Sequence, residues 1–187
     1  YGVKVEYGEH EATGSVTVLA DPRFDIPVAE RDTKLATIMH AGALQEVIAN
    51  AVERIGETRS QIGDVLERTE PGEDEGEEGT ASETSGEDPL EALRQAAKDL
   101  KNVLEELEER LWTPPGTTKG IVYTTDVYGR LRYVSGALGS SWDAPTPSQE
   151  TYLAAAEAQL QQIIADFNRI FAEDVAAFRQ QVEEAEL

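Results

Sequence analysis

The chain has 187 residues, of which 37 are Asp or Glu and 16 are Lys or Arg, giving a formal net charge of −21. Such an acidic surface repels phosphate backbones and anionic lipid headgroups, which argues against nucleic acid and membrane surfaces as partners. The bias resembles the surfaces of proteins from high-salt habitats, with an ordinary acidic soluble domain as the alternative. There is no Cys, so disulfides, thiolate metal sites and Cys nucleophiles are excluded.

Residues 1–24 predict a β-hairpin. Apolar and polar residues alternate on both sides of a predicted loop over 8–14, with Val3, Val5 and Tyr7 before it and Val16 and Val18 after it. An isolated hairpin is marginal in water, so we expect further strands upstream or packing against helices. The chain begins inside this strand without Met, which we interpret as a fragment or processed product, and residues 1–20 lack the pattern of a signal peptide.

A long helix is predicted over about 28–68, because apolar residues recur there at steps of three and four. The predicted apolar face comprises Leu35, Ile38, Met39, Gly42, Leu44, Val47, Ile48, Ala51, Ile55, Ile62, Val65 and Leu66. Gly42, Gly56 and Gly63 predict kinks or close helix contacts, since glycine is unfavourable inside a helix.

The stretch 70–88 has no large apolar residue and many like charges, so it predicts a flexible acidic linker. A calcium loop is the alternative, but the required ligand spacing is missing. Asp88-Pro89-Leu90-Glu91 then predicts the start of a second helix, which Trp112 and the Pro-Pro-Gly sequence at 114–116 end. Its heptad seam is Leu93, Ala97, Leu100, Leu104, Leu107 and Leu111.

Two more helices are predicted. A shorter one carries Val127, Leu131, Val134 and Leu138. Thr146-Pro147-Ser148-Gln149 predicts the start of a long one, with Thr146 as the cap and Gln149 three residues on to complete a capping box. Its apolar side is Leu153, Ala156, Leu160, Ile163, Phe167, Ile170, Phe171, Val175, Phe178 and Val182. We therefore predict a mainly α fold, an antiparallel bundle of three long helices and one shorter helix over 25–187. The hairpin would remain from a preceding β-sandwich.

The order of these landmarks resembles the C-terminal region of bacterial sortilin-like, BNR-repeat proteins, often named glycosyl hydrolases or YVTN/BNR-like repeat proteins. The matching residues are a strand over 15–19, Asp21-Pro22-Arg23-Phe24, the segment 129–138, Asp143-Ala144-Pro145-Thr146 and Tyr152. The acidic insertion at 70–88 and the Pro-Pro-Gly sequence depart from that pattern. The resemblance implies an exported parent protein whose propeller and β-sandwich precede the helices, with any hydrolase site in the propeller repeats.

No catalytic set is found in the chain. Pairs of carboxylates arise by chance among 37 acids, and Glu105, Glu106, Glu108 and Glu109 are expected on a solvated helix face. His10, expected in the hairpin loop, and His40, expected at a helix surface or interface, lack a second ligand at zinc spacing. Ser135 has no nucleophile-elbow sequence, and no phosphate-binding glycine motif occurs, so we expect no catalytic or metal residues and no cofactor.

Six aromatic residues cluster between the second and last predicted helices: Trp112, Tyr123, Tyr128, Tyr133, Trp142 and Tyr152. They are candidates for an interaction surface for sugar or protein, and the alternative is that they fill one end of the bundle. Our leading hypothesis is a non-catalytic accessory domain that packs on its parent propeller or sandwich or holds a partner protein. The alternatives are a substrate-binding part of a glycoside hydrolase and a helical adaptor that self-associates through the seam of the second helix.

Overall fold

The computed structural model describes residues 1–69, 89–114 and 126–187. Within them, strands β1 (Gly2–Tyr7) and β2 (His10–Ser15) precede helices α1 (Val28–Thr69), α2 (Pro89–Leu111), α3 (Val127–Gly139), α4 (Pro147–Ala172) and α5 (Asp174–Glu184). The predicted helical bundle with an N-terminal antiparallel hairpin is confirmed. The predicted linker over 70–88, and Pro115 and Gly116 of the Pro-Pro-Gly sequence, lie outside the described residues.

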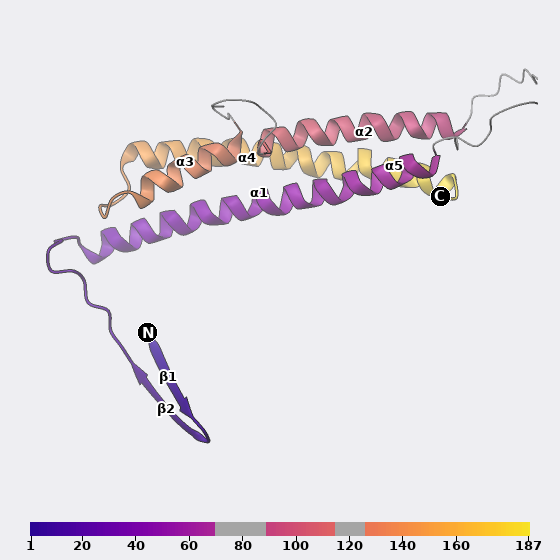
Figure 1. Cartoon of the computed structure of the whole chain (residues 1–187). Helices are drawn as coiled ribbons and strands as arrows, with labels where there is room; N and C mark the ends of the chain where they lie inside the picture. Colours follow the sequence, from indigo (N-terminus) through magenta and orange to yellow (C-terminus); the bar gives the residue numbers. More distant parts are fainter. Residues whose placement is uncertain (70–88, 115–125) are drawn as a thin grey trace, which may run out of the picture.

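The helices form three parallel columns (Figure 1). α1 forms the first column. α2 and α3 follow one another in the second column and run opposite to α1, and α4 and α5 form the third column and run in the same direction as α1. Polar contacts close both ends. Lys34 near the start of α1 donates to the carbonyl oxygens of Ser141 and Asp143 beyond α3, and Arg94 near the start of α2 donates to the carbonyl oxygen of Thr69.

The core is built from heptad seams that meet between the columns. The predicted seams of α2 and α3 are buried as expected: Leu93, Ala97, Leu100, Leu104, Leu107, Leu111, Val127, Leu131, Val134 and Leu138. The buried residues of α1 are Ala41, Ile48, Ala51, Ile55 and Ile62. Four more residues of its predicted face are partly buried against this core: Ile38, Leu44, Val65 and Leu66. Each fully buried Leu or Ile contributes about 1.5–3 kcal/mol relative to exposure, so these seams hold the three columns together.

The last predicted helix is divided at Glu173, which ends α4 and precedes α5 with φ −106° and ψ −66°. The buried positions explain the break. They step by three and four as far as Ile170, but the next buried residue is Val175, five positions on. A continuous heptad would have turned Asp174 inward instead. The helix break absorbs the extra residue and keeps Val175 and Phe178 in the core.

The hairpin has a tighter turn than predicted. Gly8, with φ +60°, and Glu9 connect β1 directly to β2, so Val5 lies opposite Ala12. A two-residue turn with a left-handed glycine first matches the twist of paired strands. The predicted loop over 8–14 is therefore wrong, and Val18 lies beyond β2. His10 begins β2 instead of lying in a loop.

A turn at Asp21 follows the hairpin. The Arg23 side chain donates to the Asp21 carboxylate from Nε to Oδ1 at 3.0 Å, from Nε to Oδ2 at 3.1 Å and from Nη2 to Oδ2 at 2.6 Å. The Phe24 amide donates to the Asp21 carbonyl oxygen at 3.1 Å. The Arg23 side chain, and secondarily its backbone amide, holds the pKa of the Asp21 carboxyl below its ordinary value. A lowered pKa means that this pairing is present above the ordinary pKa and is lost as the pH falls through the lowered one.

We expect Arg23→Ala to raise the pKa of Asp21 toward its ordinary value, because both the guanidinium charge and its hydrogen bonds are removed. A carbon-detected NMR titration of the Asp21 carboxyl measures this pKa directly. The nearby Asp25 serves as the control carboxyl within the same spectra. An unchanged Asp21 titration in the variant would contradict the assigned cause.

The glycines of α1 do not mark close helix contacts. α1 is unbroken from Val28 to Thr69, and a Cβ built at Gly42, Gly56 or Gly63 meets no atom within 4 Å. The prediction of close contacts at these positions is wrong. The glycines instead leave the helix less stable than alanine would.

We therefore expect Gly56→Ala to raise the free energy of unfolding by about 0.5–1 kcal/mol, since alanine restricts the unfolded chain and fits the open space. Urea unfolding followed by circular dichroism at 222 nm measures the change. Gly8→Ala is the contrasting variant: its positive φ disfavours alanine, so the hairpin should loosen while the urea transition of the bundle stays in place. A lower midpoint for Gly56→Ala would refute this account of α1.

Candidate functional site

The aromatic candidates occupy separate places in the fold. Trp112, after α2, and Tyr128, in α3, line an open hollow of about 500 Å³ with Ile48, Val52 and Glu53 of α1. The indole N–H of Trp112 donates to Glu108 Oε1 at 3.2 Å, which fixes its orientation. The lining of the hollow is mainly apolar, and its one carboxylate is that of Glu53.

The other described candidates, Tyr133, Tyr152 and Trp142, lie in two further aromatic pairs. Tyr133 of α3 contacts Tyr152 of α4, with ring centroids 5.4 Å apart. Trp142, in the α3–α4 connection, stacks on Phe24 at 6.0 Å and is 69% exposed. Tyr123 lies outside the described residues. The described members thus form three small clusters, and neither a single aromatic row nor one shared aromatic core unites them.

Carboxylates gather at a polar hollow of about 570 Å³ between α2, α3 and α4, with Glu106, Glu109 and Asp126 among its lining residues. Asp126 is buried, and both of its oxygens are engaged. Oδ1 accepts from the Gly129 amide at 2.6 Å and Oδ2 from Thr113 Oγ1 at 2.9 Å. This carboxylate therefore caps α3, and its hydrogen bonds account for its burial.

One of the four α2 glutamates departs from the expected solvated face. The Glu108 side chain is 14% exposed and accepts a 2.5 Å hydrogen bond from Arg59 of α1. The prediction for Glu108 is therefore wrong, whereas Glu105, Glu106 and Glu109 are exposed as expected. A charge-assisted bond at the edge of the α1–α2 seam explains the difference.

The other candidate side chains have structural partners. His40 lies at the expected helix interface, with Nε2 2.9 Å from Glu157 Oε2 of α4. Ser135 Oγ accepts from Gln45 at 3.0 Å. Across the three described ranges, no group of three His, Asp or Glu residues is placed to hold a metal ion.

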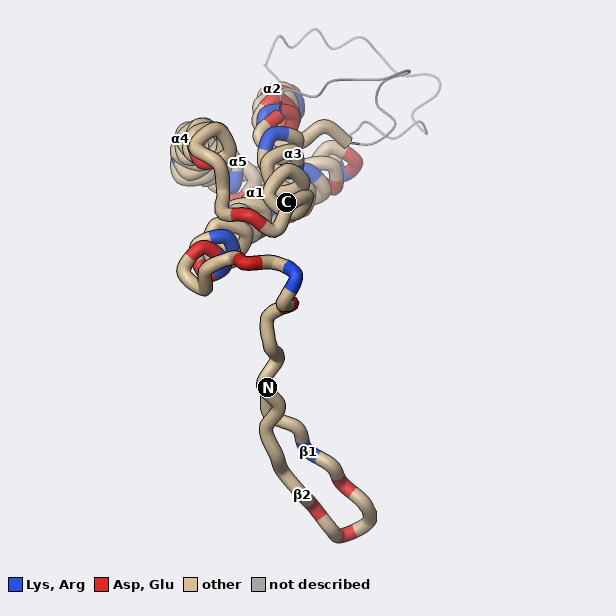
Figure 2. Tube along the Cα trace, turned by 90° about the vertical axis from the view of Figure 1, so that its left-hand side faces the viewer, with Lys and Arg blue, Asp and Glu red and all other residues tan. Residues whose placement is uncertain are grey.

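Exposed apolar side chains concentrate at the N-terminal end of the chain. Every residue of the hairpin is exposed, and one hairpin face carries Val3, Val5 and Tyr7. The hairpin projects away from the helices (Figure 2). No β-sheet other than this two-stranded one occurs among the described residues. The hairpin therefore presents both of its edges and its apolar face to solvent.

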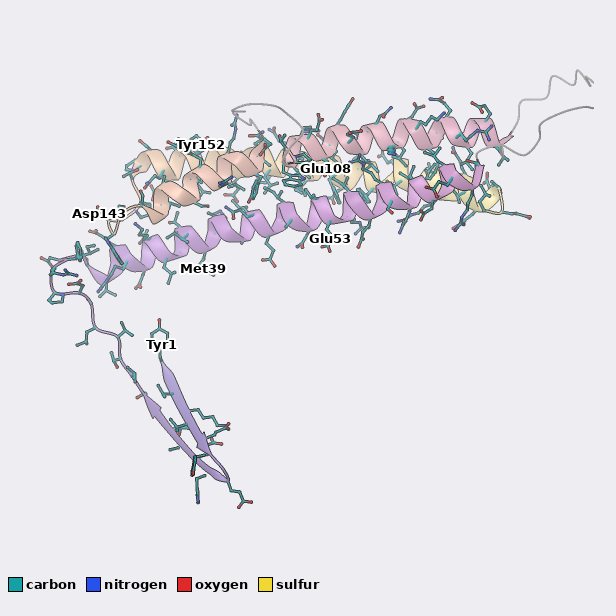
Figure 3. All side chains as sticks on the ribbon, in the orientation of Figure 1. Tyr1, Met39, Glu53, Glu108, Asp143 and Tyr152 are labelled. Carbon is teal, nitrogen blue, oxygen red and sulfur yellow. The ribbon has the colours of Figure 1, made fainter. Side chains whose placement is uncertain are left out.

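The first half of α1 adds a second exposed apolar region. Leu35, Met39 and Val47 were predicted to face the core, but each is exposed, Met39 by 65%. Figure 3 shows Met39 pointing away from the other helices. The prediction is wrong because helical periodicity gives α1 a wider apolar stripe than α3 and α4 cover. Periodicity alone does not distinguish the covered part of a stripe from the uncovered part.

No family model, curated protein or solved structure matches the chain. The resemblance to sortilin-like, BNR-repeat proteins therefore stays a prediction. None of the described helices is long and apolar enough to cross a membrane.

Proposed function

We propose that the chain is a non-catalytic accessory domain, with a scaffolding or protein-interaction role, of an exported BNR-repeat propeller protein. The helical bundle is its rigid body, and the hairpin is the element that joins it to a neighbouring β-sheet. The propeller and β-sandwich of the same protein are the first candidates to supply that sheet, and another protein is the second.

The exposed hairpin is the observation that carries this proposal. A two-stranded hairpin needs a further strand or a packed face to be stable in water. Here Val5 is 61% exposed, Tyr7 is 84% exposed, and neither edge of the hairpin is paired within the described residues. An added strand would satisfy the edge amides and carbonyls, and the body of a sheet would cover the valines.

The polar groups of the bundle support a structural role. Two carboxylates with little exposure, Asp126 and Glu108, are engaged in a helix cap and an interhelical ion pair. These two carboxylates therefore have structural partners, whereas Glu106 and Glu109 of the polar hollow are exposed.

The two alternatives have less support from the geometry. Sugar binding as part of a glycoside hydrolase would favour aromatic rings along one groove, whereas Trp142 and Tyr133 belong to separate clusters. Self-association through the α2 seam would need that seam exposed, whereas Leu104 and Leu111 are fully buried inside the chain.

A glycoside assay tests the non-catalytic character. We expect the purified chain to release no methylumbelliferone from a panel of α- and β-linked methylumbelliferyl glycosides above the buffer rate. The matched control is the variant Glu106→Gln/Glu109→Gln, which removes two carboxylates from the polar hollow and leaves the Asp126 cap intact. Turnover by the wild-type chain that this variant lost would refute the proposal.

A further inference from the structure

The hairpin has two open edges, and the backbone pattern identifies which residues form each of them. Tyr1 and Val16 exchange two backbone hydrogen bonds of 2.9 Å. Because inward and outward residues alternate along an antiparallel strand, Gly2, Lys4 and Glu6 point their backbone groups outward from β1. The proposed function needs one edge for a neighbouring sheet, which leaves the other edge unassigned.

The β1 edge carries charges that complement themselves. Lys4 and Glu6 are both outward residues on the polar face, and Lys4 Nζ lies 2.6 Å from Glu6 and 2.9 Å from Glu11. If a second β1 pairs antiparallel about Val5, each Lys4 lies opposite Glu6 of the second copy. If the pairing is centred on Lys4 instead, Lys4 of one copy lies opposite Lys4 of the other. Opposite charges stabilise directly facing positions and like charges destabilise them, so charge selects the register centred on Val5.

The same register matches the apolar face. Val5 meets Val5 of the second copy, and Val3 meets its Tyr7, so the valines and tyrosines of both chains share one side of the sheet. The β1 edge is accessible because the hairpin projects away from the helices (Figures 1 and 2). The joined hairpins make a four-stranded antiparallel sheet, which exceeds the two strands that are marginal alone.

We infer that the β1 edge is an interface for a second copy of this chain, paired about Val5 with Lys4 facing Glu6 of the second copy. This rests on the proposed function in one respect, that the hairpin is the joining element. The β2 edge, with Glu11, Thr13 and Ser15 outward, remains for a strand of another domain.

Charge exchange between two copies tests the inference. Sedimentation equilibrium of the full chain is measured at about 0.15 M salt, where repulsion between the acidic bundles is screened beyond about 8 Å. We expect a reversible dimer for the wild type. Lys4→Glu and Glu6→Lys each place like charges opposite one another and should weaken self-association about tenfold. A 1:1 mixture of the two variants restores both Lys–Glu pairs and should dimerise as the wild type does.

The mixture separates the interface from effects within one hairpin, because mixing cannot repair a variant's own hairpin. Lys98→Glu, an exposed substitution on α2 with the same charge change, should dimerise as the wild type does. A wild-type chain that stays monomeric at about 1 mM, or a mixture no tighter than either variant alone, overturns the inference. If the chain is monomeric, hydrogen exchange of the hairpin amides tests the proposed function separately. Rapid exchange of these amides still agrees with the proposed function, whereas strong protection of them contradicts it.

Discussion

Leu104→Ala is expected to lower the free energy of unfolding by about 2–5 kcal/mol. Leu104 is 0% exposed and lies in the α2 seam, which packs against α1, α4 and α5. Shortening this side chain removes buried methyl groups and leaves a cavity that the three columns cannot easily close. Urea unfolding monitored by circular dichroism gives the change as a shift of the transition midpoint.

Val103→Ala is the matched control for Leu104→Ala, because Val103 is the preceding residue on the same helix and is 38% exposed. Its substitution should change the free energy of unfolding by less than about 1 kcal/mol. Equal losses for both variants would mean that the α2 seam is not the interior of the bundle.

Asp126→Ala is expected to lower the free energy of unfolding by about 1–3 kcal/mol. Its carboxylate accepts from the Gly129 amide and from Thr113, so it caps α3 and ties the start of that helix to the residues after α2. Alanine removes both bonds and leaves the Gly129 amide without this partner. The unfolding free energy from urea titration measures the cost.

Asp126→Asn is the control for the cap, because a side-chain amide oxygen can still accept from Gly129 and asparagine is a favourable N-cap residue. We expect it to retain most of the stability that the alanine variant loses. If the asparagine variant is destabilised as much as the alanine variant, the negative charge and not the cap geometry holds this end of α3.

The bundle could be predicted because its buried residues recur at regular steps of three and four along the sequence. Leu100, Leu104 and Leu107 recur at steps of four and three, and the same residues are buried. The capping box at Thr146 and Gln149 likewise forms as predicted, with reciprocal side-chain bonds to the two backbone amides. These features depend on neighbours within two helical turns, so local sequence is sufficient to predict them.

Features that depend on more distant neighbours could not be predicted in the same way. Leu35 and Met39 have the spacing of a core stripe, yet both are exposed. Lys34 and His40 beside them contact the α3–α4 connection and α4, so Leu35 and Met39 lie on a face of α1 that these helices do not cover. The helix break at Glu173 was not visible in the sequence, because Phe171 stands four residues before Val175 and continues the apolar spacing. The two-residue turn at Gly8 was visible in principle, but alternation fitted a longer loop equally well.

The candidate site was predicted least well. Proximity in sequence suggested one aromatic surface, but Trp142 stacks on Phe24, 118 positions earlier. This contact depends on how distant parts of the chain meet at one end of the bundle, which local sequence does not show. The burial and ion pair of Glu108 depend on the position of Arg59, far away in the sequence. The hairpin was expected to have further strands upstream or to pack against the helices. Every hairpin residue is exposed, so it does not pack against the described helices, and the further strands stay a prediction.

Hydrogen–deuterium exchange of the isolated chain, held at a concentration where it is monomeric, tests the central claim most directly. If the hairpin is a joining element that lacks its partner, the amides of β1 and β2 should exchange at nearly the unstructured rate, while core amides of α1, α2 and α4 are strongly protected. If instead the amides of β1 and β2 were protected as strongly as those around Leu104, the hairpin would be stable by itself, and the account of it as an unpartnered joint would be wrong.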